Sequence, residues 1–328
     1  MRVMCCYAPK QDLLLEKWPD PTPQRGQLLI QVHACGVCRT DLHVIDGELT
    51  GALSPVIPGH EIVGHIVALG DDVTGFRLGE RVGVPWLGHT CGTCRFCETK
   101  QENLCENARF HGFTLQGGYA DYVVAEARYC FHLPDRYIDV EAAPLLCAGL
   151  IGYRALRFAQ EANCLGIYGF GTAAHLVAQI ACHQGREVYA FTRPGDRAAQ
   201  RFALSIGARW AGDSDTAPPK LLDAALLFAP VGSLVPTALS HLVAGGVVVC
   251  AGIHMTDIPA FPYRLLWGER QIRSVANLTR DDGLDFLRLA EQVPLQVHVT
   301  PYPLEHANHA LFDLRCGRVQ GAAVLTTF

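Results

Sequence analysis

The chain lacks several features that mark whole classes of protein. Its longest apolar stretches, around residues 221–231 and 243–253, are too short and too interrupted to span a bilayer. The first residues contain no apolar stretch of the kind that a signal peptide has. The formal net charge is −5 and no long basic run appears, which argues against a nucleic-acid partner. We also find no internal repeat and no low-complexity segment, and we expect a cytoplasmic, globular protein without membrane or nucleic-acid partners.

The length and the apolar pattern predict two domains. The 328 residues exceed the usual size of one hydrophobic core. Short alternating stretches broken by Gly and Pro fill the first 147 residues and indicate a β-rich, barrel-like domain, with strands expected at 28–32, 62–69, 81–84 and 119–125. From Leu165 onward, apolar strands alternate with helical stretches, as in βαβ units with a parallel sheet. There we expect strands at 165–168, 187–191, 223–228, 246–251 and 272–275, helices at 173–183, 196–206, 234–243 and 282–292, and a surface loop at 211–220.

The segment from Cys38 to Glu61 concentrates side chains that can bind a metal ion. A thiolate and a neutral imidazole are ligands that zinc prefers, and a catalytic zinc uses three protein ligands and keeps one position open. Cys38 and His60 are candidates for two of these ligands. Cys35 and Cys38 also form a CxxC pair, which in another context is a redox motif. Taken alone, His60 is better explained as a hydrogen-bonded core histidine, and the metal interpretation depends on finding a third ligand and a cofactor site elsewhere in the chain.

A second set of cysteines predicts a structural zinc site. Cys91, Cys94, Cys97 and Cys105 follow the spacing C-x2-C-x2-C-x7-C. Four thiolates around zinc make a closed site with no place for substrate. The first three spacings also occur in ferredoxins, but there the fourth cysteine lies three residues on and precedes proline. Here it lies later and precedes Glu106, which favours zinc.

A glycine-rich turn predicts a dinucleotide site. Gly169, Gly171 and Ala174 follow an apolar strand and open a helix, in the pattern G-x-G-x-x-G/A. The first glycine permits the turn, the second lets the backbone approach a pyrophosphate, and the alanine allows close helix–strand packing. Together with Thr172, the helix N-terminus offers free N–H groups to the phosphates.

Together these motifs resemble the zinc-dependent alcohol dehydrogenases of the medium-chain dehydrogenase/reductase superfamily. The resemblance covers essentially the full chain, including the stretches 142–149, 302–305 and 321–325. It implies an α/β protein in which a GroES-like, β-rich catalytic domain accompanies a Rossmann domain with a doubly wound parallel sheet. The expected division is 1–148 for the GroES-like domain with its structural-zinc lobe at 91–105, 149–277 for the Rossmann domain, and 278–328 for the return to the catalytic domain.

The resemblance also implies roles for residues near the candidate metal. It names Cys147 as the third ligand of the catalytic zinc. Glu61 matches a carboxylate that approaches the metal during ligand exchange, and Asp41 matches the acid that orients the ligand histidine. Thr40 and His43 match a relay that carries the alcohol proton to solvent. The implied reaction is reversible hydride transfer between a primary or secondary alcohol and NAD(P), with two zinc ions per chain.

Some positions concern the coenzyme and the substrate. Arg39 matches a pyrophosphate contact, and Trp86 and Leu49 match positions of the alcohol pocket. Relatives often hold a larger aromatic where this chain has Leu49, which suggests a roomier pocket. The family often has an arginine at the position of Ala322, so either Arg39 or Arg280 is expected to meet the phosphates instead.

The second Rossmann strand predicts the coenzyme preference. Thr192-Arg193 stands where the family usually has an acidic residue that binds the ribose 2′-OH of NAD. A guanidinium there favours the 2′-phosphate of NADP through charge-assisted bonds. NAD use stays open, because Arg193 can point to solvent and Asp196 can supply an acidic contact.

Other functions also fit part of the pattern. A zinc-free quinone or enoyl reductase shares the fold but normally lacks both ligand sets. A polyol dehydrogenase or aldehyde reductase of the same superfamily has the same motifs, and a metal-binding regulatory protein needs only the four-cysteine lobe. By resemblance, we expect a small-molecule substrate and a homo-oligomer, either dimer or tetramer.

Overall fold

The chain crosses four times between two structural units. The computed structural model describes residues 1–159, 161–319 and 321–327. Unit 1 comprises Met1–Cys147, Asn277–Gln292 and Val297–Phe328, and unit 2 comprises Ala148–Ala276 and Val293–Gln296. These limits lie one residue before the expected ones, and the short return of 293–296 to unit 2 has no counterpart in the sequence-based division.

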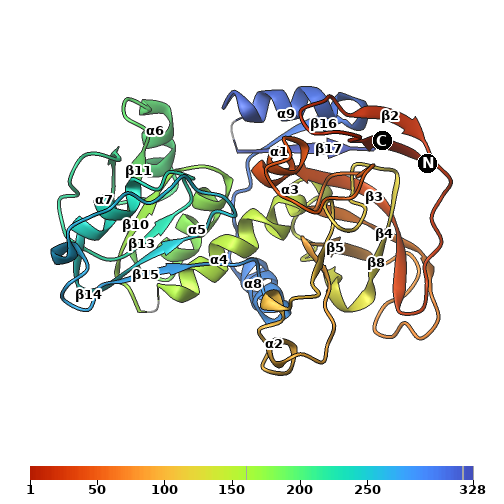
Figure 1. Ribbon diagram of the computed structural model, residues 1–328, viewed down its shortest axis with the longest axis horizontal. Helices are drawn as coiled ribbons and strands as arrows, with labels where there is room; N and C mark the ends of the chain where they lie inside the picture. Colours follow the sequence, from red (N-terminus) through yellow and green to blue (C-terminus); the bar gives the residue numbers. More distant parts are fainter. Residues whose placement is uncertain (160, 320, 328) are drawn as a thin grey trace. The chain divides into compact units, whose positions relative to one another are not determined.

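Unit 1 is built mainly from strands (Figure 1). Its strands are β1 (Arg2–Cys5), β2 (Leu14–Lys17), β3 (Gln27–Val37), β4 (Ile62–Leu69), β5 (Arg81–Val84), β6 (Leu87–His89), β7 (Arg109–Phe110), β8 (Tyr122–Glu126), β9 (Phe131–His132), β16 (Val299–Pro303) and β17 (Ala322–Thr326). Its helices are α1 (Arg39–Ile45), α2 (Arg95–Glu98), α3 (Asp139–Ala142), α8 (Arg280–Gln292) and α9 (Ala307–Arg315), with 3-10 turns η1 (Glu102–Leu104), η2 (Ala127–Tyr129), η3 (Ala143–Leu146) and η5 (Leu304–His306).

The strand β3 lies at the centre of the unit 1 sheet. The sheet order is β16-β17-β3-β4-β5-β9, and β8 also pairs with β3. Along β3, buried residues alternate with partly exposed ones as far as Ala34, the period expected of a strand with one face on a core. The last buried residues of β3 lead directly to Cys38, so the candidate ligand is held at the end of the most extensively paired strand.

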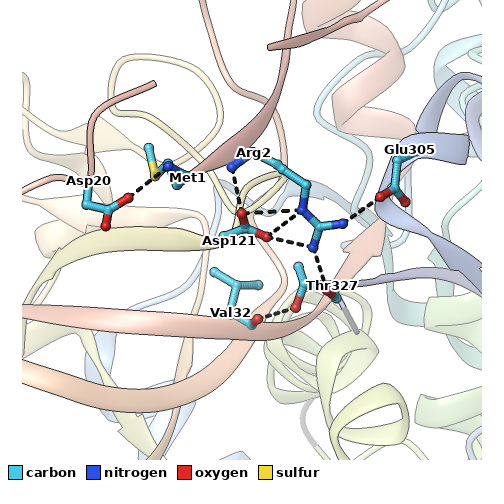
Figure 2. Close-up of polar contacts among 7 residues, drawn as sticks. All are labelled: Met1, Arg2, Asp20, Val32, Asp121, Glu305 and Thr327. Atoms are coloured by element: carbon cyan, nitrogen blue, oxygen red, sulfur yellow. Dashed lines mark hydrogen bonds and ion pairs between the residues drawn. The ribbon is translucent and has the colours of Figure 1, made fainter. Parts of the chain in front are cut away.

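An arginine next to the N-terminus joins segments that are far apart in the sequence (Figure 2). The Arg2 guanidinium donates to Asp121 Oδ1 at 2.8 Å, to Glu305 Oε1 at 2.5 Å and to the Thr327 carbonyl oxygen at 2.6 Å. The Thr327 hydroxyl in turn donates to the Val32 carbonyl oxygen of β3. Unit 1 therefore combines the beginning and the last described residues of the chain around one sheet.

Unit 2 is a parallel sheet with helices between its strands (Figure 1). Its elements are α4 (Ala148–Phe158), β10 (Cys164–Tyr168), α5 (Thr172–His183), β11 (Glu187–Thr192), α6 (Arg197–Ser205), β12 (Trp210–Asp213), β13 (Leu222–Leu227), α7 (Leu234–Ser240), β14 (Leu242–Cys250), η4 (Tyr263–Leu265) and β15 (Gln271–Ser274). The sheet order is β12-β11-β10-β13-β14-β15, and each pair is parallel. This is the 3-2-1-4-5-6 order of the Rossmann fold, whose ligand site lies where the order reverses, after the first strand.

Two of the predicted elements are wrong in part. The expected loop at 211–220 begins with a strand, because β12 pairs in parallel with β11 from Trp210 to Asp213. Its residues include Gly and Asp, which are poor strand formers, so the sheet overrides local propensity. The helix expected at 234–243 ends at Ser240, since Leu242 already begins β14. Among the described residues, no helix is both long and apolar enough to cross a membrane.

Candidate active site and metal sites

Cys38, His60, Glu61 and Cys147 come together in unit 1. One potential ligand atom from each lies within 4.8 Å of the others. Cys38 follows β3, the pair His60–Glu61 precedes β4, and Cys147 follows η3. Three separate segments therefore supply the cluster that the sequence predicted only in pieces.

The geometry of this cluster fits a zinc ion. The Sγ atoms of Cys38 and Cys147 are 3.8 Å apart. In a tetrahedral site with Zn–S bonds of about 2.3 Å, the sulfur atoms are separated by about 3.8 Å. His60 is fully buried, and its Nε2 has no hydrogen-bond partner among the described residues, a costly state for a polar atom unless it binds something else. A metal ligand is the simplest role for that nitrogen.

Asp41 fixes the orientation of the candidate ligands. Its buried carboxylate faces His60 Nδ1 at 3.1 Å, which leaves Nε2 as the ligand nitrogen. The same carboxylate accepts hydrogen bonds from the Cys38 N–H at 2.8 Å, the Gly59 N–H at 3.2 Å and the Tyr119 hydroxyl at 3.2 Å. Tyr119 was not a candidate in the sequence, because nothing near it in the chain belongs to the metal motifs. Four contacts hold Asp41 in place and, through it, His60.

Glu61 lies buried beside the thiols, and Gly36 makes room for it. A Cβ atom at Gly36 would lie 1.8 Å from Glu61 Oε2. Burial raises the pKa of Glu61, whereas a hydrogen bond from Cys147 lowers the pKa of Cys38 well below its usual value. Cys35 is buried within β3 and is a free thiol, as is Cys38, so this CxxC is not an oxidised redox pair. Gly36, between the two cysteines, leaves space for the Glu61 carboxylate.

The predicted relay residues share one face of α1. Thr40 Oγ1 lies 3.8 Å from Cys38 Sγ, and His43 follows one turn later, at the i, i+3 spacing that makes helix residues neighbours. His43 Nδ1 contacts the Glu48 carboxylate, which sequence reasoning missed. The Glu48 N–H also donates to the His43 carbonyl oxygen at 2.9 Å. Arg39, the first residue of α1, is exposed.

Aromatic side chains cover one side of His60. The Trp86 ring meets the His60 imidazole edge-on at 5.0 Å between centroids. Phe110 and Phe113 stack on Trp86 at 5.2 and 5.8 Å, respectively, and were not among the predicted residues. The only sequence signal was their spacing, two aromatics three residues apart just after the cysteine lobe. Leu49, the other predicted pocket residue, is partly buried and packs against the same core cluster.

The four-cysteine lobe has the dimensions of a zinc–tetrathiolate site. The Sγ separations are 3.5 Å for Cys91–Cys105, 3.6 Å for Cys94–Cys97 and 3.9 Å for Cys91–Cys97. They bracket the sulfur–sulfur distance of about 3.8 Å expected around tetrahedral zinc. Gly92 has a φ of +76°, so it permits the turn between the first two cysteines. The short elements α2 and η1 leave little else to order this lobe.

The glycine turn of unit 2 is open where a pyrophosphate would bind. Gly169 follows β10 with a φ of +86°, and a Cβ there would lie 2.7 Å from the Ala229 nitrogen. A Cβ on Gly171 would meet nothing within 4 Å, so the space in front of α5 is free. Ala174 is fully buried in the first turn of α5, which begins at Thr172. The residues present therefore fit a dinucleotide on the helix N-terminus.

The end of β11 carries an exposed arginine and no acidic side chain. Arg193 is exposed, whereas the Thr192 hydroxyl is buried and accepts from Gln200 Nε2 at 3.1 Å. Asp196 Oδ1 accepts from the Ala199 N–H at 3.0 Å and thereby caps α6. Asp213, at the end of β12, accepts from Gly195 N at 3.1 Å and from Gln200 Nε2 at 2.6 Å. Both carboxylates near the turn after β11 are thus engaged within unit 2.

The two remaining candidates lie in unit 1. Ala322 is buried in β17. Arg280 begins α8 and is exposed, and its N–H donates to Glu102 Oε1 in the cysteine lobe at 2.6 Å. No described contact engages its guanidinium in an ion pair, so Arg280 is compatible with the phosphate contact proposed from the sequence.

Comparisons with known proteins agree with this arrangement. Residues 24–135 match the family model of the alcohol dehydrogenase GroES-like domain. Over 313 residues, the chain is 49% identical to a probable alcohol dehydrogenase, AdhA, of Mycobacterium tuberculosis, covering 93% of this chain and 90% of that protein. The cobalt- and zinc-bound thermostable alcohol dehydrogenase of Pyrobaculum aerophilum superposes with a TM-score of 0.90 at 28% identity, covering 99% of each chain. Acetophenone reductase of Geotrichum candidum in complex with NAD gives a TM-score of 0.90 at 26% identity, covering 100% of this chain and 97% of that one.

Proposed function

This chain belongs to the zinc-dependent alcohol dehydrogenases of the medium-chain dehydrogenase/reductase superfamily, and on that premise we propose that Cys38, His60 and Cys147 form its catalytic metal site. The chain is an NAD(P)-dependent oxidoreductase acting on alcohols. The observation that carries the proposal is the buried His60 Nε2, which lacks a hydrogen-bond partner and belongs to a cluster with two thiols. Zinc bound there would act as a Lewis acid on the alcohol oxygen.

The residues around the cluster have separate proposed roles in proton transfer and in positioning the ligands. Thr40 Oγ1 lies 3.8 Å from the candidate ligand atom Cys38 Sγ, which makes it the first member of the relay. It accepts the hydroxyl proton of the alcohol and releases its own hydroxyl proton towards His43. His43 receives the proton one helical turn further on, and Glu48 holds the His43 ring through Nδ1. Asp41 keeps His60 in one tautomer, and Glu61 provides a second carboxylate within reach of the ligands.

A second metal ion in the lobe would have a structural role. The three Sγ separations support tetrahedral thiolate coordination by Cys91, Cys94, Cys97 and Cys105. Such a closed site leaves no open position for substrate, and its binding free energy contributes to folding of the lobe. We therefore propose two zinc ions per chain, one catalytic and one structural.

We propose that the coenzyme binds unit 2 and that NADP is preferred. Gly169, Gly171, Thr172 and Ala174 would hold the pyrophosphate at the N-terminus of α5. Arg39 stays a candidate for the pyrophosphate contact on the sequence resemblance alone. Arg193 would meet the 2′-phosphate, and Thr192 supports the turn that carries it. The capping role of Asp196 supports this preference, because a carboxylate bonded to its own helix is less available to a ribose hydroxyl.

The substrate would lie against an aromatic wall. Trp86 covers His60, with Phe110 and Phe113 stacked behind it, and Leu49 belongs to the same apolar cluster. These side chains offer dispersion contacts and no charge, which favours apolar or aromatic alcohols over polyols. A polyol would leave hydroxyl groups without partners at this wall.

We further propose that the chain assembles with itself in the cytoplasm. Among the described strands, β15 pairs only with β14 and forms one edge of the unit 2 sheet. All residues of β15 are exposed, and Tyr263 and Trp267 nearby are 71% and 68% exposed. An edge with exposed aromatic residues is suited to pairing with a second copy about a two-fold axis. All fourteen cysteines are free thiols, a state that a reducing compartment preserves.

An assay across alcohols with both coenzymes tests the enzymatic proposal. Purified, zinc-loaded protein should reduce NADP⁺ or NAD⁺ in the presence of primary, secondary and aromatic alcohols, and a Cys38→Ser variant that folds should not. A Cys316→Ser variant is the matched control, because Cys316 is exposed and lies outside both cysteine clusters. Equal activity of the Cys38→Ser variant and the wild type would overturn the assignment of the metal site.

A further inference from the structure

A third group of potential metal ligands lies outside the two cysteine sets. His33, His65 and Asp139 each offer one ligand atom, and these atoms lie within 4.8 Å of one another. His33 is on β3, His65 is on β4 and Asp139 is the first residue of α3. All three residues belong to unit 1 and are partly exposed, so solvent ions can reach them.

The sheet places the two histidines side by side. The pairing of β3 with β4 is irregular between Val32 and Ala34, so His33 lies at a bulge. Bulges locally change the direction in which a side chain points. His65 pairs with Gln31 of β3 on one side and with Arg81 of β5 on the other. The His33 and His65 rings are 4.4 Å apart between centroids and tilted by 43°.

The carboxylate of Asp139 is held in position by an arginine. Arg81 Nε donates to Asp139 Oδ1 at 2.7 Å, while another nitrogen of its guanidinium donates to the Tyr137 carbonyl oxygen at 2.6 Å. The second carboxylate oxygen, Oδ2, faces His33 Nδ1 at 2.9 Å. Arg81 therefore orients the carboxylate through one oxygen and leaves the other directed at the histidines, as hydrogen-bonded partners do for metal ligands.

One ring nitrogen of this group lacks a partner. His65 Nδ1 is buried and forms no hydrogen bond with any described residue. A buried polar atom without a partner is destabilising, so such atoms usually have a bound water or ion. The side chains of His33 and Asp139 are 25% and 28% exposed, which leaves coordination positions for water on the outer side of the group.

We propose that His33, His65 and Asp139 form a third metal site, which binds divalent transition-metal ions such as Ni²⁺ reversibly and more weakly than the two cysteine-containing sites hold their zinc ions. Two imidazoles and one carboxylate are ligands typical of these ions and poor ligands for Mg²⁺ or Ca²⁺. In octahedral coordination, metal–ligand bonds of about 2.1 Å place neighbouring ligand atoms about 3 Å apart. His33 Nδ1 and Asp139 Oδ2 already have that separation, and the His65 ligand atom lies within 4.8 Å of both.

A bound ion would connect the sheet to the segment that carries Cys147. Asp139 begins α3, which continues through η3 to Cys147. An ion shared by β3, β4 and α3 would restrain this segment at its start. Metal binding should therefore slow local opening of residues 139–147, in addition to stabilising unit 1 as a whole.

Calorimetric titration with Ni²⁺ tests the proposal on protein that already carries zinc at its cysteine sites. Wild type should bind one Ni²⁺ that His65→Gln and His33→Gln bind at least tenfold more weakly. The matched control is His309→Gln, which removes an exposed histidine that also faces a carboxylate, Asp313, at 3.3 Å. Zinc content measured before and after titration separates exchange at the cysteine sites from new binding.

Hydrogen exchange gives a second readout that binding elsewhere would not produce. Ni²⁺ should slow exchange of the backbone amides of 139–147 in wild type and in His309→Gln, and should leave them unchanged in His65→Gln. The proposal is wrong if wild type binds no additional Ni²⁺, if His65→Gln binds it with wild-type affinity, or if exchange of 139–147 is the same with and without the ion.

Discussion

Replacing Arg193 by alanine should reduce the preference for NADP over NAD. Arg193 is the first residue after β11, at the position where the coenzyme ribose binds in a Rossmann domain. Its side chain is exposed. The two nearby carboxylates already accept backbone hydrogen bonds, Asp196 from the Ala199 N–H and Asp213 from the Gly195 N–H. The guanidinium is therefore the group best placed to distinguish a 2′-phosphate from a 2′-hydroxyl.

The size of the effect follows from the exposure of the arginine. A hydrogen bond to a charged group contributes about 1.5–3 kcal/mol, whereas exposed ion pairs contribute about 1 kcal/mol or less. Because Arg193 is exposed and a bound coenzyme would cover it only partly, we expect about 1.4 kcal/mol. That value corresponds to roughly a tenfold fall in the ratio of kcat/KM for NADP to kcat/KM for NAD.

The measurement is steady-state kinetics with both coenzymes at a saturating alcohol concentration. Arg209→Ala is the control, because Arg209 is also exposed but precedes β12 and donates its N–H to Val188, near the start of β11. The same loss of charge at the opposite end of the strands should leave the ratio unchanged. An unchanged ratio in Arg193→Ala, or an equal fall in Arg209→Ala, would refute the assignment.

Three further predictions concern the metals, the proton path and pH. Metal analysis should find two zinc ions per chain, and a single zinc in fully loaded wild type would contradict the two-site proposal. Cys94→Ser should lose one zinc ion and have a lower Tm. Cys38→Ser should lose activity but keep its fold, as measured by circular dichroism. Thr40→Ala should lower kcat at least 100-fold. His43→Ala should lower kcat by less, because water can replace the outer member of the relay. A larger loss of kcat in His43→Ala than in Thr40→Ala would show that the relay is misassigned. Burial lowers the pKa of His111 to about 4, so between pH 6.5 and 4 the unfolded chain binds a proton that the folded chain does not, and stability falls as pH falls. Urea unfolding from pH 6.5 to 5 should show wild type losing about 1.5 kcal/mol more than His111→Asn, since the unfolded histidine is already half protonated at pH 6.5, and parallel curves would exclude this contribution.

The sequence predicted the parts of the fold that depend on short-range patterns. The strand at 62–69 and the strand at 81–84 have the expected limits, because their apolar residues and flanking turns leave no alternative. The short strand β12 was missed, because its residues, Trp210–Asp213, form a strand only through pairing with β11. Pairing between distant segments is a tertiary effect that local propensity does not contain.

The residues of the candidate site also differ in whether the sequence could predict them. Cys38 and His60 could be selected from residue type and spacing, whereas Cys147 required a resemblance, because it lies 109 residues from Cys38. Glu48 and Tyr119 could not be predicted at all. Each acts through a single contact, with His43 and Asp41 respectively, and no spacing rule connects them. Contacts of that kind depend on the path of the backbone in the folded protein, which local sequence patterns do not specify.

The position of β17 has a consequence for synthesis on the ribosome. Unit 2 obtains its whole sheet from one continuous segment, so β10 to β15 can pair as soon as residue 276 has emerged. Unit 1 cannot do so, because β17 lies between β16 and β3, and Arg2 binds the Thr327 carbonyl oxygen. Until the last strand emerges, the edge of β3 from Ala34 to Val37 remains open beside Cys38. The nascent protein therefore completes its Rossmann domain first, and the strand that leads to the proposed metal site is the one exposed to wrong partners for longest.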